Sequence, residues 1–198
     1  MTIADHVPEN LQQLYEIYEH RHAAAILSCE FSEEYSELCY AMESFRFKKE
    51  DVLAGGGNES NIPKRFSSIL KGRLGWVEDK LTAQLVVDGK QISQDTHKVD
   101  FLKGRVAFDL EWNSKDQTFD RDLYAFRTFF EFDRISVGVL VTRSNQLDPW
   151  FSSLGKDIKL KFGASTTHMG KLLPRLRAGR SGGCPILVFG ITPALLEE

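Results

Sequence analysis

Apolar side chains recur at helical spacing through the N-terminal third of the chain. Residues 8–25 begin with a proline suited to a first helical turn and then carry apolar positions three or four apart, which predicts one helix over this stretch. Similar spacing predicts helices over 32–45 and 63–74. Between these two helices, the run AGGGNESNIP at 54–63 marks a clear break.

The C-terminal two thirds alternate between strand and helix patterns. A strand is predicted at 81–87, a hairpin over 99–112 and an amphipathic helix over 120–133. The segments 135–142 and 186–191 are nearly continuous apolar runs rich in β-branched residues, which is typical of strands covered on both faces. These elements predict a single α/β domain around a mixed sheet flanked by helices.

The predicted hairpin has one wholly apolar face. A two-residue turn at Lys103–Gly104 is expected because glycine suits the second turn position, and Val99 would then face Phe108 across the ladder. Alternate residues of a strand share a face, so the apolar face must point at the core. Its members are Val99, Phe101, Val106, Phe108, Leu110 and Trp112.

The opposite face of the hairpin carries three carboxylates, Asp100, Asp109 and Glu111. Alternate residues of a strand lie about 6.6 Å apart, so the last two side chains can reach one ion. Oxygen ligands of this kind suit a hard divalent cation such as Mg²⁺, which also joins a substrate phosphate. An ordinary solvent-facing strand with neighbouring basic residues fits the same spacing, so spacing alone leaves both interpretations open.

The composition is that of a soluble globular protein, with 198 residues of which 42% are hydrophobic and 27% charged. No run approaches the roughly 18 apolar residues of a membrane helix, and the polar start MTIADHVPEN is no secretory signal. Cys29, Cys39 and Cys184 suit neither a disulfide framework nor a metal knuckle. A cytoplasmic protein without a membrane partner is therefore expected.

The net charge of −3 hides a strong division along the chain. Residues 1–60 hold 12 acidic and 4 basic side chains, whereas 61–198 hold 16 acidic and 21 basic ones. Within 156–180 there are seven basic residues and one acid. This asymmetry favours an anionic partner for the later part of the chain.

The run DFLKGRVAFDLE at 100–111 resembles the active-site hairpin of the PD-(D/E)XK type II restriction endonucleases, and is most similar to the BglII and BstYI group. The resemblance extends to IPKRF at 62–66, ISVGVLVTR at 135–143 and RLRAGRSGGCPILVFGITP at 175–193. It implies a restriction-endonuclease-like central mixed β-sheet flanked by helices. It also implies Mg²⁺-dependent, sequence-specific hydrolysis of double-stranded DNA by a homodimer that cuts both strands.

The resemblance also assigns roles to the three acids. Asp100 corresponds to the first aspartate of the motif, the main metal ligand. Asp109 stands at the second acid, where the group usually has glutamate. Glu111 occupies the position of the motif's lysine, where the nearest relatives have glutamine, so it is expected to act as a general base or as a ligand of a second ion.

The glycine-rich run GGGNES at 55–60 lacks the GK[ST] of a phosphate-binding loop. It is either a flexible turn or a loop that approaches the DNA backbone and brings Lys64 and Arg65 to a phosphate. By resemblance, Glu59 supports a metal-bound water, with Asn58 one residue away as the alternative.

Further DNA contacts are expected in two segments. One directly follows the acidic strand, where the family places base or phosphate contacts, and the other combines arginines with glycines before the last apolar run. Arginine is the usual bidentate partner of guanine in the major groove, although a solvated basic loop fits equally well. The candidates in these segments are Asn113, Ser114, Lys115, Arg175, Arg177 and Arg180.

The chain is expected to form one nuclease domain over 1–198. Its acidic helical part, 1–50, is a candidate dimer interface, and 51–198 would form the catalytic and DNA-contacting core. Two alternatives remain at this point: a structure-specific or non-specific DNA nuclease of repair, and a non-cleaving DNA-binding protein on a nuclease scaffold. The recognition sequence is not readable from the chain because it depends on loop placement and DNA shape.

Overall fold

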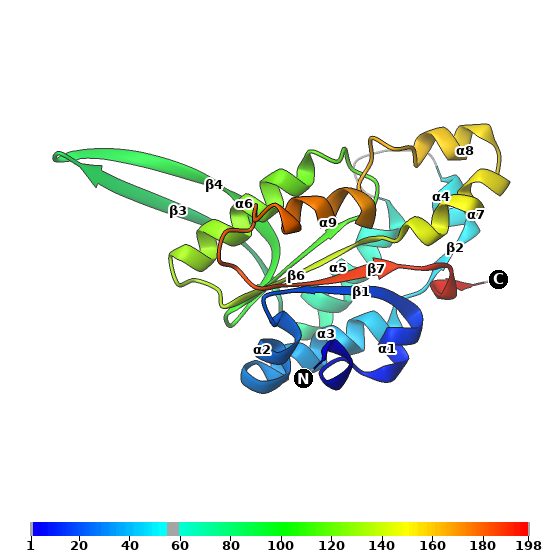
Figure 1. The fold of residues 1–198 in the computed structure, drawn as a ribbon, viewed down its shortest axis with the longest axis horizontal. Helices are drawn as coiled ribbons and strands as arrows, with labels where there is room; N and C mark the ends of the chain where they lie inside the picture. Colours follow the sequence, from blue (N-terminus) through cyan, green and yellow to red (C-terminus); the bar gives the residue numbers. More distant parts are fainter. Residues whose placement is uncertain (1, 55–59, 198) are drawn as a thin grey trace.

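The computed structural model describes residues 2–54 and 60–197, with the backbone alone at 82–87 and 91–96 (Figure 1). Its centre is a six-stranded mixed sheet in the order β1-β7-β6-β5-β4-β3. The neighbours β5, β6 and β7 are parallel, whereas β1–β7, β4–β5 and β3–β4 are antiparallel pairs. The strands of this sheet are β1 Tyr15–His20, β3 Val77–Val87, β4 Lys90–Lys103, β5 Val106–Glu111, β6 Val137–Arg143 and β7 Ile186–Ile191. A separate parallel pair joins β2 Phe47–Lys48 and β8 Leu196–Glu197.

Helices cover both faces of the sheet, as the sequence predicts. One apolar cluster lies between the sheet and α1, α2, α3 and α5, and a second lies under α6 and α9 (Figure 1). The mixed α/β fold class is thereby confirmed. The helices are α1 Glu9–Leu14, α2 Ala23–Glu30, α3 Ser32–Ser44, α4 Lys49–Leu53, α5 Asn61–Leu74, α6 Thr118–Glu131, α7 Asp148–Ser153, α8 Lys156–Lys161 and α9 Met169–Arg177.

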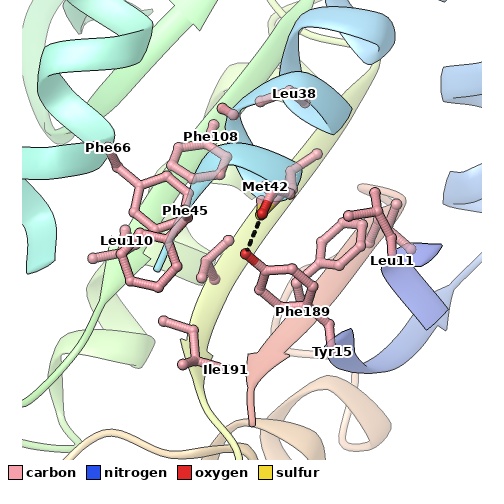
Figure 2. Packing of buried hydrophobic residues seen from close by; sticks show 14 of the residues in the cluster. Leu11, Tyr15, Leu38, Met42, Phe45, Phe66, Phe108, Leu110, Phe189 and Ile191 are labelled. Atoms are coloured by element: carbon pink, nitrogen blue, oxygen red, sulfur yellow. Dashed lines mark hydrogen bonds between the residues drawn. The ribbon is translucent and has the colours of Figure 1, made fainter. Parts of the chain in front are cut away.

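Aromatic side chains fill the core on the α3 and α5 side of the sheet (Figure 2). The rings of Phe45 and Phe66 stack at 4.4 Å, and Phe66 continues to Phe108 of β5 at 5.9 Å. The hydroxyl of Tyr15 donates 2.9 Å to the carbonyl of Met42, so its one polar atom is satisfied inside the core. Strands β6 and β7 are buried at every position, which confirms the two predicted apolar strands.

The single helix predicted over 8–25 is wrong. Helix α1 ends at Leu14, and the chain then forms β1, which pairs with β7 at the edge of the sheet. Within β1, Ile17 packs against the first cluster and Tyr18 against the second, so the pattern has the period of a strand. Pairing with a strand 170 residues later overrides the local helical spacing.

The hairpin of β4 and β5 turns one residue later than the sequence predicts. Lys103 pairs with Val106 and Phe101 with Phe108, so the turn is Gly104–Arg105, with Gly104 at a φ of +53°. The partner of each residue therefore moves by two positions, and this leaves the two faces of the hairpin unchanged. The apolar face contacts the first cluster as expected, except for Val99, which joins the second.

A β-bulge explains the position of Val99. Leu102 pairs with Val77 and Val99 with Asp79, so two residues of β4, Asp100 and Phe101, lie opposite the single residue Glu78 of β3. Bulges of this kind redirect side chains and interrupt strand pairing. Beyond the bulge, β3 and β4 continue as a long hairpin that extends away from the body of the molecule (Figure 1), and its length was not predicted.

Candidate active site

Two acids meet where β4 and β5 separate. The ladder between these strands stops at Phe101–Phe108. One step further, the backbone N–H of Asp100 donates 2.7 Å to Oδ1 of Asp109, so a side chain replaces the carbonyl that would continue the ladder. The bulge in β4 and this bond together set the distance between the first two predicted metal ligands.

Asp109 is buried, with 3% of its surface exposed. Burial raises its pKa well above the usual range, and the neighbouring Asp100 charge adds to this, against the hydrogen bond from the Asp100 backbone. Its second oxygen, Oδ2, is buried and has no hydrogen-bond partner in the part of the chain that the structure describes. A buried carboxylate oxygen left unpaired is costly unless a cation or donor comes to it.

Glu111 lies at the end of β5 and shows the same feature. Burial raises its pKa first, hydrogen bonding with the Ser114 side chain opposes this, and the Asp100 charge raises it further. Its Oε2 is also buried without a partner among the described residues. Ser114, which the sequence predicts to contact DNA, thus contacts a predicted catalytic acid.

A fourth carboxylate, Asp122 of α6, was missed by the sequence analysis. Burial raises its pKa well above the usual range, followed by the charges of Asp109, Glu111 and Asp100. Its Oδ2 is buried and unpartnered within the described ranges. Asp122 lies three residues after Phe119 and four before Phe126, on the apolar face of α6, and an acid on such a face was the signal available in the sequence.

The donors at this site fit a hard divalent cation. The unpaired atoms are carboxylate oxygens from β5 and α6, the ligand type that Mg²⁺ prefers. Among the described residues, no three His, Cys, Asp or Glu side chains are gathered closely enough to hold a metal ion as they stand. Mutual repulsion of charged carboxylates opposes such an approach until a cation is added.

Glu59, and Asn58 beside it, lie outside the described residues. Of the basic residues that follow, Lys64 is exposed on α5. Arg65 instead contacts the buried Asp51 at 2.7 Å and the carbonyl of Arg46 at 2.5 Å, and so ties α5 to the segment before the glycine-rich run. A DNA contact by Arg65 would have to share this side chain with Asp51.

The segment that follows β5 stays close to the acids. Asn113 has a buried Oδ1 without a partner among the described residues. The carbonyl of Ser114 accepts 2.9 Å from the N–H of Thr167, and Lys115 forms a bridge with Thr166. The side chain of Lys115 is exposed. These contacts place the three candidates between the acids and the loop before α9.

The three arginines of the C-terminal segment all contact neighbouring side chains. Arg175 donates 3.1 Å to Asp120 of α6, and Arg180 pairs with the same carboxylate. The guanidinium of Arg177 lies 5.7 Å from the ring centre of Tyr18. The structure therefore places Arg175 and Arg180 on α6, the helix that carries Asp122, and Arg177 against β1, rather than any of them on the acids themselves.

A family match found by comparison with known proteins covers the acidic hairpin and the central sheet. No described helix has the length and apolar character needed to cross a membrane. No curated protein matches the chain. A family model described as restriction endonuclease BglII/BglIII matches residues 15–191, which include β1, the acidic hairpin and β7. The chain belongs to this family of restriction endonucleases and is a type II site-specific deoxyribonuclease.

Proposed function

We propose that this endonuclease hydrolyses both strands of double-stranded DNA at a specific sequence, as a homodimer and with Mg²⁺ as its cofactor. The observation that carries the proposal is a pair of buried carboxylate oxygens, one from Asp109 and one from Glu111, that have no hydrogen-bond partner within the described part of the chain. Asp109 lies beside Asp100. Family members generally use divalent metal ions, and the donors in this chain are of the matching chemical type.

Asp100 and Asp109 are the residues that would hold the ion. Asp109 uses Oδ1 to accept the Asp100 N–H, which fixes the side chain and leaves Oδ2 for a ligand. When bound, Mg²⁺ lowers the pKa of a coordinated water and neutralises charge on the scissile phosphate. Both acids come from strands, so their positions are held by the sheet.

Glu111 is proposed as the general base or as a ligand of a second ion. Hydrogen bonding with the Ser114 side chain opposes the effect of burial on its pKa, and Oε2 remains to accept a proton from water or to meet an ion. Its pKa is raised toward neutral pH, the range in which a general base works best. Glu59 is proposed to support a metal-bound water.

DNA contacts are proposed at the exposed basic and polar side chains around these acids. Phosphate contacts suit Lys64 and Lys115, because both are exposed and carry positive charge. The remaining proposed contacts are Arg65, Asn113, Ser114, Arg175, Arg177 and Arg180. Arg65, Arg175 and Arg180 pair with carboxylates in this structure. On DNA binding these arginines would leave their carboxylates and contact phosphates or bases.

The homodimer follows from the chemistry of two-strand cutting. One chain carries one set of acids, and a palindromic site has two equivalent phosphates, so a two-fold dimer places one site on each strand. Residues 1–50 are proposed to contribute the interface, and Tyr40 of α3 is a large side chain left 46% exposed there. The three cysteines are free thiols, which suits the reducing cytoplasm that we propose as the location.

A plasmid digest tests the proposal. We expect discrete fragments with Mg²⁺, no cleavage with EDTA, and none with Asp100→Ala, while light scattering reports a dimer. Sequencing of the fragment ends would give the recognition site. A smear of products, cleavage in EDTA or full activity of the variant would each contradict the proposal.

A further inference from the structure

A pocket of about 190 Å³ opens beside Asp100, between α5 and the bulged part of the sheet. Its polar lining comes from three elements: Ser67 and Lys71 of α5, Glu78 of β3, and Lys98 and Asp100 of β4. Glu78 is the residue opposite the bulge that positions Asp100. The pocket is therefore built by the same irregularity as the active site, and on its α5 side.

Two lysines and two carboxylates, Glu78 and Asp100, line this pocket. Nζ of Lys98 lies 2.8 Å from the Glu78 carboxylate and Nζ of Lys71 lies 3.9 Å from the same oxygen. Two ammonium groups thus share one carboxylate. Lys71 also lies 4.9 Å from the ring centre of Phe101, which holds its stem over the pocket.

The ion pairs of Glu78 are accessible and exchangeable. The side chains of Lys98 and Glu78 are 54% and 45% exposed, and that of Lys71 is 37% exposed. Ion pairs at such exposure are weak, so another anion can replace the carboxylate at little cost. Removing Glu78 from between the lysines would leave two ammonium groups and the Ser67 hydroxyl facing one space, with the Asp100 carboxylate on its active-site side.

A DNA strand that reaches Asp100 brings phosphates past this pocket. The acids of the active site repel a phosphodiester, and the two lysines supply attraction on the adjacent side. Phosphate oxygens accept hydrogen bonds from ammonium and hydroxyl groups, the donors that line the pocket. We propose that Lys71, Lys98 and Ser67 bind a backbone phosphate next to the scissile one, and that Glu78 occupies this position until DNA displaces it. This rests on the proposed function of the Asp100 site.

Two variants of opposite sign test the proposal by fluorescence anisotropy with a labelled duplex in EDTA, across a series of salt concentrations. The double variant Lys71→Ala/Lys98→Ala should bind DNA about ten-fold more weakly, and the slope of log affinity against log salt should fall by about one. Glu78→Gln should bind DNA several-fold more tightly, because it frees both lysines.

Asp79→Asn is the matched control for Glu78→Gln. Asp79 is the next residue of β3 and holds Arg134 at 3.0 Å, so this change removes the same charge and also releases a basic partner. We expect a smaller gain in affinity for Asp79→Asn, and no gain from Glu78→Gln when Lys71 and Lys98 are already alanine. Equal gains for the two acid variants, or unchanged binding by the double variant, would overturn the proposal.

The source of the phosphate and the proposed function are tested separately. Inorganic phosphate should weaken DNA binding more in wild type than in the double variant, because both anions would use the same donors. Selective binding of inorganic phosphate by wild type, together with equal DNA affinity of wild type and the double variant, would assign the pocket to a free phosphate ion and overturn the DNA assignment. DNA binding is measured without metal, whereas the digest requires Mg²⁺. A loss of DNA affinity in the lysine variant therefore supports the phosphate site even if the plasmid is not cleaved. A failed digest with normal lysine dependence would contradict only the proposed function.

Discussion

The backbone N–H of Asp100 and the carboxylate of Asp109 are joined by a 2.7 Å hydrogen bond. An amide oxygen can accept the same bond, so Asp109→Asn should keep the hairpin while removing a buried negative charge. We expect DNA cleavage to fall at least about 100-fold. We also expect the metal-free protein to become more stable by about 1 kcal/mol, because repulsion with its neighbours is relieved.

Cleavage assays and urea unfolding in EDTA measure the two effects of Asp109→Asn. Asp79→Asn, an exchange on the exposed side of the sheet edge, is the control for a general effect of charge. A variant that is less active and also less stable would show that Asp109 serves the fold rather than the reaction.

Added Mg²⁺ should stabilise the wild-type protein. A ligand that binds only the native state at ten times its Kd adds about 1.4 kcal/mol, which corresponds to a few degrees in Tm for a domain of this size. The shift should vanish in Asp100→Asn/Asp109→Asn. Differential scanning calorimetry with and without Mg²⁺ measures it, and an equal shift in the double variant would place the ion elsewhere.

Arg143 supports the loop that leaves the carboxyl end of β6. The side chain is 1% exposed and donates to Asp148 at 3.0 Å, to the Phe162 carbonyl at 2.9 Å and to Thr166 at 2.7 Å. Arg143→Met leaves the buried Phe162 carbonyl without this donor and also removes the bonds to Asp148 and Thr166, so we expect a loss of about 3 kcal/mol in urea unfolding. Arg127→Met, which removes an exposed pair with Glu131, should cost less than about 0.5 kcal/mol.

Asp120 should make part of the stability depend on pH. Burial raises its pKa, but the hydrogen bonds from Arg175 and Arg180 outweigh this, so the pKa lies below the usual 3.8. A lowered native pKa adds stability that is present above pH 4 and is lost as the pH falls through the native value. The difference in Tm between wild type and Asp120→Asn should therefore be largest above pH 5 and shrink toward pH 3. A difference that is constant with pH would contradict this account.

Much of the site could be predicted because it depends on alternation along one hairpin. The turn lies one residue later than predicted, so each residue of the hairpin pairs with a partner two positions away from the expected one. Because side chains alternate between faces, a shift of two leaves Asp100, Asp109 and Glu111 on the same face. Asp122 was not predicted because it reaches the acids from a helix. Its proximity depends on how α6 packs on the sheet, which no local pattern specifies.

The sequence predicts the strands that are buried along their whole length. It does not predict the elements whose pairing partner is distant in the sequence. The apolar runs of β6 and β7 specify buried strands by themselves. The segment Tyr15–His20 has no such property, because only Tyr15 is buried there and the other five residues, two acids among them, are half-buried. Pairing with β7 makes this segment a strand, and the bulge at Asp100 likewise depends on pairing with β3.

The edge pairing of β1 also sets the order in which the molecule is completed. Tyr15 pairs with Ile191, and the Thr192 hydroxyl donates 2.6 Å to the carbonyl of Leu14. Contacts at such separation form late, because the long loop between them must close first. On the ribosome, β1 therefore waits for β7, long after the acidic hairpin has been synthesised. The sheet that carries the acidic hairpin becomes whole only after β7 has been synthesised.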